Sequence, residues 1–210
     1  MLFRNRRDAG YRLAHMLLHL QQQPGLLVLG IPRGGVIVAA EVAHILGAQL
    51  DIILARKLGA PDQPELAIGA VAADGIVFLN EDVISDLNIP PAYIERERAE
   101  QLVELEQREA LYRQGLAPLK LDGQTVIVVD DGVATGATTI AALRAVRKRN
   151  PRRLTLAVPV APAEMVQRLE RECDEAVFIA TPDLFLSVGR FYDLFAQVTD
   201  TQVIDALQAH

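Results

Sequence analysis

The hydrophobic positions of this chain fall into short, nearly continuous runs, separated by longer stretches with helical spacing. The runs are rich in Val, Ile and Leu and lack strict alternation, which is typical of strands buried on both faces. Because short connections join these runs to the helical stretches, the pattern predicts an α/β fold with an open, mostly parallel sheet flanked by helices. The expected strands are 26–30, 50–55, 125–130, 153–159 and 175–180, and the expected helices are 6–22, 36–46, 138–149 and 162–172.

One region between the second and third expected strands interrupts this alternation. It begins with a Pro-rich stretch, which predicts a loop, and continues with a hairpin that turns at Asp74-Gly75. A charged helix then starts at the Pro90-Pro91 pair and ends near Gly115; its mixed charges predict that it lies on the surface. We expect a single domain over residues 1–210, with a core at about 6–180, an insertion at 57–120 and a C-terminal segment at 181–200.

The composition favours a packed protein and excludes several classes. Of the 210 residues, 50% are hydrophobic and 23% are charged, so a globular core is expected rather than disorder. The apolar runs are too short to span a bilayer, and no apolar segment of a secretory signal follows the N-terminal arginines. The single cysteine, Cys173, cannot form an internal disulfide. These features predict a cytoplasmic protein with no membrane partner.

The charge distribution narrows the class of ligand. A formal net charge of −6 argues against general nucleic-acid binding. Residues 1–60 nevertheless hold seven Arg and Lys against three Asp and Glu, a net of +4, so the remaining residues carry −10. A basic first third inside an acidic protein suits a small anionic ligand better than a long polyanion.

The stretch GIPRGGV, residues 30–36, follows an expected strand and precedes an expected helix. Gly34 and Gly35 can adopt positive φ angles, which would let successive backbone N–H groups converge on an anion. The helix N-terminus and Arg33 would add positive charge. The alternative is a glycine-rich turn that only connects strand and helix, because the stretch has neither Walker nor G-x-G-x-x-G spacing.

A second loop, DDGVATGATT, follows the strand that ends at Asp130. Its threonine hydroxyls and Gly136 could surround an oxyanion, although Asp131 or Thr135 could instead be a simple helix N-cap. Ligands of open parallel sheets bind outside the carboxyl ends of the strands, so the two loops would face one crevice if their strands are neighbours. The ligand would then have two anionic ends joined by a group that carboxylates bind. A sugar diol fits that description, with Mg²⁺ to neutralise charge.

The stretch VIVVDDGVATGAT resembles the 5-phosphoribosyl-1-pyrophosphate (PRPP) fingerprint of type I phosphoribosyltransferases at all thirteen positions. GIPRGG resembles the pyrophosphate loop of that family, ARKLGAPDQPELAIGA its mobile loop, and residues 181–200 its C-terminal hood. The resemblance implies a type I phosphoribosyltransferase fold. It also implies Mg²⁺-dependent transfer of the phosphoribosyl group from PRPP to a ring nitrogen of a nucleobase or similar heterocycle, with release of pyrophosphate. Dimers are common in the family, so a homodimer is one assembly that it allows.

The same resemblance assigns roles to individual residues. Asp130 and Asp131 would hold the ribose hydroxyls and could contact the Mg²⁺, which PRPP itself mainly binds. The pyrophosphate would meet Arg33, Gly34 and Gly35, with Arg56 and Lys57 approaching as the mobile loop closes and water is expelled. The turn that would wrap the 5-phosphate consists of Ala134, Thr135, Gly136, Ala137, Thr138 and Thr139.

The acceptor side is less well defined. TPDLFLSVGRFYDLF resembles the purine-binding hood of the hypoxanthine–guanine branch, apart from one extra residue before Val188. By that likeness Phe185 would stack on the base, Leu186 would offer main-chain hydrogen bonds and Asp193 would accept from a base N–H. The alternative is that the aromatic residues of this segment only fill the core.

A second departure concerns proton transfer. The hypoxanthine–guanine branch has a proton-handling Asp where this chain has Ala134, so a general base, if one is needed, comes from elsewhere; Glu65 in the mobile loop is the candidate. Two hypotheses follow: a phosphoribosyltransferase, or a catalytically silent PRPP-binding regulator of the same fold. The retained Arg56-Lys57 pair and GIPRGG loop favour the enzyme. A receiver domain would carry its acid pair early in the chain rather than at Asp130, which argues against that class.

Overall fold

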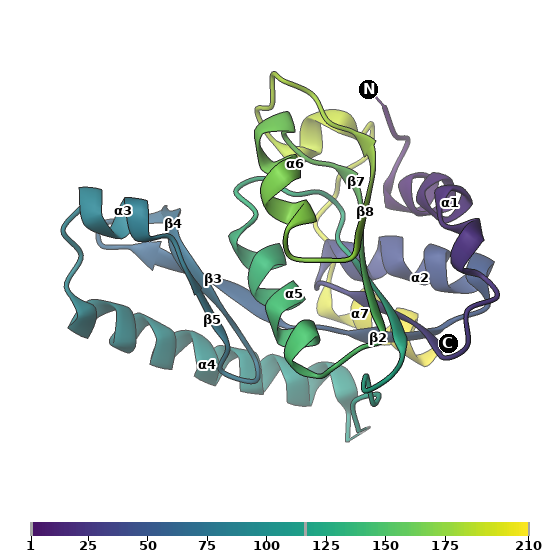
Figure 1. The fold of residues 1–210 in the computed structure, drawn as a ribbon, viewed down its shortest axis with the longest axis horizontal. Helices are drawn as coiled ribbons and strands as arrows, with labels where there is room; N and C mark the ends of the chain where they lie inside the picture. Colours follow the sequence, from purple (N-terminus) through teal and green to yellow (C-terminus); the bar gives the residue numbers. More distant parts are fainter. Residues whose placement is uncertain (1, 116, 210) are drawn as a thin grey trace.

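The computed structural model describes residues 2–115 and 117–209 and has an α/β fold, as predicted (Figure 1). Its main sheet has five parallel strands in the order β2-β1-β6-β7-β8. The strands are β1 (Leu26–Gly30), β2 (Gln49–Ile52), β6 (Thr125–Val129), β7 (Arg153–Val160) and β8 (Glu175–Ala180). The second strand ends before the predicted boundary because the chain turns at Ile53 and Leu54 into a second sheet.

Helices cover both faces of the main sheet. One face packs on α1 (Arg6–Met16) and α2 (Gly34–Leu46), and the other on α5 (Ala137–Lys148) and α6 (Ala163–Glu170) (Figure 1). The first helix is shorter than predicted, and a 3₁₀ turn, η1 (Leu18–Leu20), follows it. Leu27 and Leu29 of β1 face the α5 side while Leu26 and Val28 face the α1–α2 side. Both faces are buried, which explains the unbroken hydrophobic runs.

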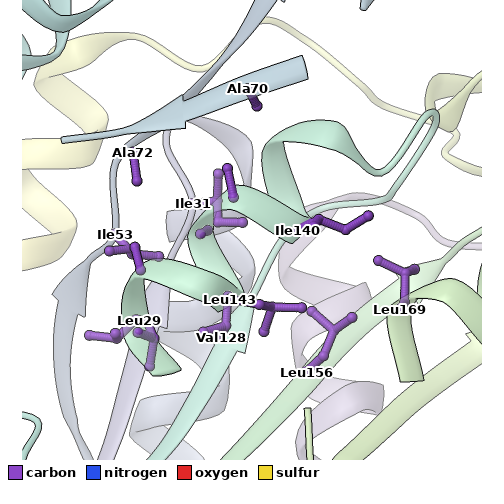
Figure 2. Packing of buried hydrophobic residues seen from close by; sticks show 14 of the residues in the cluster. Leu29, Ile31, Ile53, Ala70, Ala72, Val128, Ile140, Leu143, Leu156 and Leu169 are labelled. Atoms are coloured by element: carbon purple, nitrogen blue, oxygen red, sulfur yellow. The ribbon is translucent and has the colours of Figure 1, made fainter. Parts of the chain in front are cut away.

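The insertion contains an antiparallel sheet of β3 (Ala55–Ala60), β4 (Gln63–Ala72) and β5 (Val77–Leu79). The predicted hairpin at Asp74-Gly75 is confirmed, since it joins β4 to β5. The predicted Pro-rich loop is wrong, because β3 and β4 form a hairpin there. The small apolar residues of this β3–β4 hairpin are buried against neighbouring helices. Figure 2 shows Ala70 and Ala72 of β4 in one cluster with Ile140 and Leu143 of α5.

The long helix α4 (Pro91–Arg113) starts at the predicted proline and follows the short helix α3 (Glu81–Asp86). Its outer face carries exposed ion pairs, such as Arg96–Glu100 between residues four apart, as expected for a surface helix. Its inner face contributes Leu105 and Tyr112, both buried, to a cluster with β3, β4 and α7 (Asp200–Gln208). The insertion therefore shares a hydrophobic cluster with the C-terminal helix.

The C-terminal segment returns across the N-terminus of the chain. The N–H groups of Leu2 and Phe3 donate to the carbonyl of Phe191, and Phe3 pairs with Tyr192 in an isolated β-bridge. A 3₁₀ turn, η2 (Val188–Phe191), lies in this segment. Within the described ranges, none of the helices combines the length and apolar character needed to cross a bilayer.

Candidate functional site

Strands β1 and β6 are neighbours, with Gly30 in register with Val129. The loops that follow them, GIPRGG and DDGVATG, therefore leave the same edge of the sheet. The N–H of Ile31 continues the pairing by donating to the carbonyl of Val129 at 2.9 Å. The strand order changes direction at this point, because β2 lies to one side of β1, and β6 and β7 lie to the other. Ligands of open parallel sheets bind at such points.

The two loops touch through glycines. A Cβ atom added to Gly34 would overlap Oδ2 of Asp131, and one added to Gly35 would lie 2.8 Å from Cα of Asp130. The prediction of positive φ at these two positions is wrong, because α2 starts at Gly34 and both residues lie in its first turn. Glycine is required here because any side chain would separate the loops.

The acid pair is nearly enclosed. The side chain of Asp131 is 15% exposed, and its Oδ2 accepts from Nε of Arg6 at 2.7 Å. Its N–H donates to Oδ1 of Asp130 at 2.8 Å, and its carbonyl accepts from the hydroxyl of Tyr192 at 2.5 Å. Asp131 is thus fixed by contacts at its amide, its carbonyl and its carboxylate.

Burial also shapes the electrostatics of the pair. It raises the pKa of Asp130 well above the usual range, and the adjacent charge of Asp131 raises that pKa further. Burial raises the pKa of Asp131 as well, although the guanidinium of Arg6 opposes this shift. A hydroxyl donor or a hard cation arriving at this site would favour the ionised carboxylates. The pair is therefore suited to bind a diol, with or without a divalent metal ion.

The Thr/Gly turn leads from the acid pair into α5. Gly136 is the N-cap, with φ 76°, and no side chain caps the helix, so the alternative of Asp131 or Thr135 as N-cap is wrong. This positive φ favours glycine, and a Cβ on Gly136 would also require Cε of Met165 on α6, 2.5 Å away, to shift. Ala134 and Thr135 are exposed and Thr138 is half-buried, whereas Thr139 is buried. The exposed part of the turn is free to meet an anion.

The expected pyrophosphate-binding cations pair with acids of other elements. Arg33 precedes α2, and its Nη1 lies 3.9 Å from Oδ1 of Asp200, which also accepts from the hydroxyl of Tyr112. Arg56 on β3 forms an ion pair with Glu104 of α4. Lys57 follows Arg56 on the same strand and is half-buried. An anion at the GIPRGG loop would compete with Asp200 for Arg33.

The expected acceptor residues lie in different environments. Phe185 stacks on Phe191 with ring centroids 5.5 Å apart, and Leu186 and Asp193 are exposed. Tyr192 is buried against Phe3, so for this residue the core-filling alternative is correct. Glu65 lies on β4, and its side chain is outside the described part of the structure.

One residue near the acid pair, Arg6, was missed by the sequence reasoning. Arg6 reaches Asp131 from α1, and its guanidinium carbon lies 3.9 Å from the ring centroid of Phe195. Arg6 also lines a cleft of about 740 Å³ between α1, α2, α7 and residues 194–198. The acid pair does not line this cleft. No local pattern signals these contacts, because Arg6 and Asp131 are 125 residues apart in the sequence.

Among the described residues, no group of three or more His, Cys, Asp or Glu side chains could hold a metal ion. The basic stretch 147–153 is largely paired: Arg147 bonds to Asp174, and Arg153 lies 3.1 Å from Glu175. These contacts, made to the neighbouring strand β8 and the turn before it, support a structural role for the stretch.

The chain is similar to known proteins over its whole length. A family model described as phosphoribosyl transferase domain matches residues 12–185. Two Mycobacterium tuberculosis proteins, Putative phosphoribosyl transferase MT0597 (strain CDC 1551 / Oshkosh) and Putative phosphoribosyl transferase Rv0571c (strain ATCC 25618 / H37Rv), are each 44% identical over all 210 residues. The chain spans about half, 47%, of the length of these relatives. The crystal structure of TT1426 from Thermus thermophilus has a TM-score of 0.84 and 44% identity, with 100% of this chain and 99% of that chain covered.

Proposed function

The chain belongs to the phosphoribosyl transferase domain family, and from this membership we propose that it transfers a 5-phosphoribosyl group from PRPP to a ring nitrogen of a nucleobase or similar heterocycle. Pyrophosphate is the leaving group, and Mg²⁺ is required. The observation that supports the proposal is the close approach of Gly34 to the carboxylate of Asp131, because it brings the loop after β1 against the loop after β6. One molecule with a phosphate at each end and a diol between them could contact both loops.

In this proposal each loop binds a different part of PRPP. The carboxylates of Asp130 and Asp131 accept hydrogen bonds from the ribose hydroxyls and stabilise positive charge that develops at the anomeric carbon. The exposed turn at Ala134 and Thr135, together with the N-terminus of α5, binds the 5-phosphate. Arg33 and the N-terminus of α2 bind the pyrophosphate, which displaces Arg33 from Asp200.

The residues present fit a magnesium ion. Two adjacent carboxylates offer the hard oxygen ligands that Mg²⁺ prefers, and Arg6 is a counter-charge for only one of the two negative charges. The ion, when bound with PRPP, would neutralise the pyrophosphate and make it a better leaving group. Asp130, whose Oδ1 accepts from the N–H of Asp131, would be the protein ligand of the ion.

The acceptor is the least defined part of the proposal. Phe185, Leu186 and Asp193 lie on a segment from which side chains reach solvent, so a flat heterocycle could approach them. Ala134 cannot transfer a proton, and we retain Glu65 as the candidate general base. A second candidate function, a PRPP-binding regulator without catalysis, is favoured by Ala134 and by the Arg56–Glu104 ion pair, which holds one expected pyrophosphate ligand on α4.

One experiment separates these functions. The protein is incubated with PRPP, Mg²⁺ and a panel of purine and pyrimidine bases, and pyrophosphate release is followed. The enzyme releases pyrophosphate with at least one base, whereas PRPP binding without release supports the regulator. The double variant Asp130→Asn, Asp131→Asn should lose PRPP binding, and Asp82→Asn on the exposed side of α3 is the matched control. Failure of the unmodified protein to bind PRPP would contradict both functions.

A further inference from the structure

We infer that Arg6 is a positioning residue. It holds the carboxylate of Asp131 in the orientation that the sugar hydroxyls require. This inference rests on the proposed function. Arg6 lies outside residues 12–185, the part of the chain that matches the family model. It comes from α1, so this helix completes a site whose other parts follow β1 and β6.

The side chain of Arg6 is held in three directions. Its Nε donates to Oδ2 of Asp131 at 2.7 Å, and its Nη1 donates to the carbonyl of Ala196 at 2.8 Å. The ring of Phe195 stacks on the guanidinium at 3.9 Å. Only 12% of the Arg6 side chain is exposed. A planar guanidinium fixed by an anion, a carbonyl and an aromatic ring has one orientation, which it imposes on the carboxylate.

The acid pair needs a counter-charge in this position. Asp130 and Asp131 are adjacent, and the side chain of Asp131 is 15% exposed, so little water screens their repulsion. Without Arg6, the carboxylate of Asp131 would be an uncompensated and nearly buried charge. We expect it to rotate toward solvent or to bind a proton, and either change removes the acceptor that a ribose hydroxyl would meet.

Arg6 can stay in place while a ligand binds. An ionised carboxylate accepts hydrogen bonds at about four positions, and Nε of Arg6 uses one of them on Oδ2. The other acceptor positions of this carboxylate are not used by Arg6, and the Asp131 carbonyl is fixed separately by Tyr192. The geometry therefore favours positioning over competition, in which Arg6 would have to leave before the sugar could bind.

The test compares two ligands, each of which contains a different part of PRPP. Ribose 5-phosphate contains the diol, and inorganic pyrophosphate with Mg²⁺ does not. In calorimetric titrations, Arg6→Ala should weaken ribose 5-phosphate binding by about tenfold or more, as for other strongly coupled contacts, and change pyrophosphate binding by less than about twofold. Arg6→Lys, which keeps the charge but not the planar fork, should restore part of the loss. Arg7→Ala is the matched control, because Arg7 is exposed and pairs with Glu41.

Several outcomes would overturn the inference. If Arg6→Ala binds ribose 5-phosphate with unchanged affinity, Arg6 does not position Asp131. If this variant binds ribose 5-phosphate more tightly, Arg6 competes with the sugar for the carboxylate of Asp131. An equal loss of affinity for both ligands would show that Arg6 stabilises the fold in general and does not position Asp131 in particular. Should Arg6→Ala not fold, Arg6→Lys keeps the charge but not the planar fork, and ribose 5-phosphate binding by this variant that is as tight as in the unmodified protein overturns the inference. Failure of the unmodified protein to bind either ribose 5-phosphate or PRPP overturns the proposed function as well, so the two failures are distinguishable.

Discussion

The Cα atom of Gly34 lies so close to the carboxylate of Asp131 that a methyl group added to it would overlap Oδ2. Gly34 starts α2, whereas Asp131 follows β6, so this contact joins two loops that are far apart in the sequence. The Nε atom of Arg6 occupies the remaining space, 2.7 Å from the position that this methyl group would take. The close approach of the two loops therefore depends on the absence of a side chain at residue 34.

Gly34→Ala should separate the loops. The added methyl group would push Asp131 and Arg6 away, and overpacking of this kind costs about 1–3 kcal/mol of unfolding free energy. Urea denaturation measures that loss, and calorimetry should show weaker ribose 5-phosphate binding. Gly47→Asn is the control, because Gly47 has φ 65°, which Asn tolerates, and open space around it. Gly34→Ala could instead bind ribose 5-phosphate as tightly as the unmodified protein does. That result would contradict the conclusion that the close approach of the two loops depends on Gly34.

Glu104→Gln should release Arg56 for pyrophosphate. The Glu104 side chain is 50% exposed and that of Arg56 is 30% exposed, and such ion pairs contribute up to about 1 kcal/mol. The affinity for Mg²⁺–pyrophosphate, measured by calorimetry, should therefore rise by up to about fivefold. Glu100→Gln removes a comparable pair with Arg96 on the same helix and should leave the affinity unchanged. A weaker affinity in Glu104→Gln would mean that Glu104 positions Arg56 instead of restraining it.

Leu105→Ala should destabilise the whole protein. Leu105 is fully buried where α4 meets β3, β4 and α7, and truncation of a buried Leu costs about 2–5 kcal/mol. Val103→Ala, on the exposed side of the same helix, should stay within about 0.5 kcal/mol of the unmodified protein. Urea unfolding followed by circular dichroism gives both values. An early, separate transition in Leu105→Ala would show instead that the insertion unfolds on its own.

Cys173 should react slowly with alkylating agents at neutral pH. Burial raises the pKa of its thiol to about 11, and Sγ donates to the carbonyl of Leu169 at 3.4 Å. The folded protein therefore retains the thiol proton up to a higher pH than the unfolded chain, whose pKa is about 8.5. The stabilisation from this protonated thiol is fully present below about pH 8.5 and is lost as the pH rises through about 11.

The rate of iodoacetamide alkylation, followed by mass spectrometry, checks this expectation. The native rate should rise toward a midpoint near pH 11, whereas the urea-unfolded chain should show its midpoint near pH 8.5. Rapid alkylation of the native protein at pH 7.5 would contradict the assignment of Cys173 as an unreactive, half-buried thiol.

The main sheet and the approach of the two loops could be predicted from the sequence because their signals are local. Hydrophobic runs buried on both faces mark the strands, and a change in strand order brings Gly30 and Val129 together. The β3–β4 hairpin could not be predicted, because its proline and glycine content favours a loop and its burial depends on α4 and α5. The burial of Thr139 likewise follows from how α5 packs on the sheet.

The contacts of charged groups across the site were also beyond sequence reasoning. Arg6 meets Asp131, and Arg33 meets Asp200, through pairs of residues that the fold alone brings together. A charged residue on an expected helix is most often solvated, so its sequence position gives no reason to prefer one distant partner. The roles of Arg56, Lys57 and Glu65 toward a ligand stay predictions.

The pairing of β1 with β6 has a consequence for how the protein is made. Residues 31–124 must be synthesised between the two strands, which at about 5–20 residues per second takes on the order of 5–20 s. During this interval β1 can pair with β2, but its other edge lacks its partner strand β6. The side chains of Leu27 and Leu29 likewise lack the α5 residues on which they pack in the folded protein. The nascent chain therefore exposes an apolar strand edge on the ribosome, where chaperone binding would protect it from aggregation.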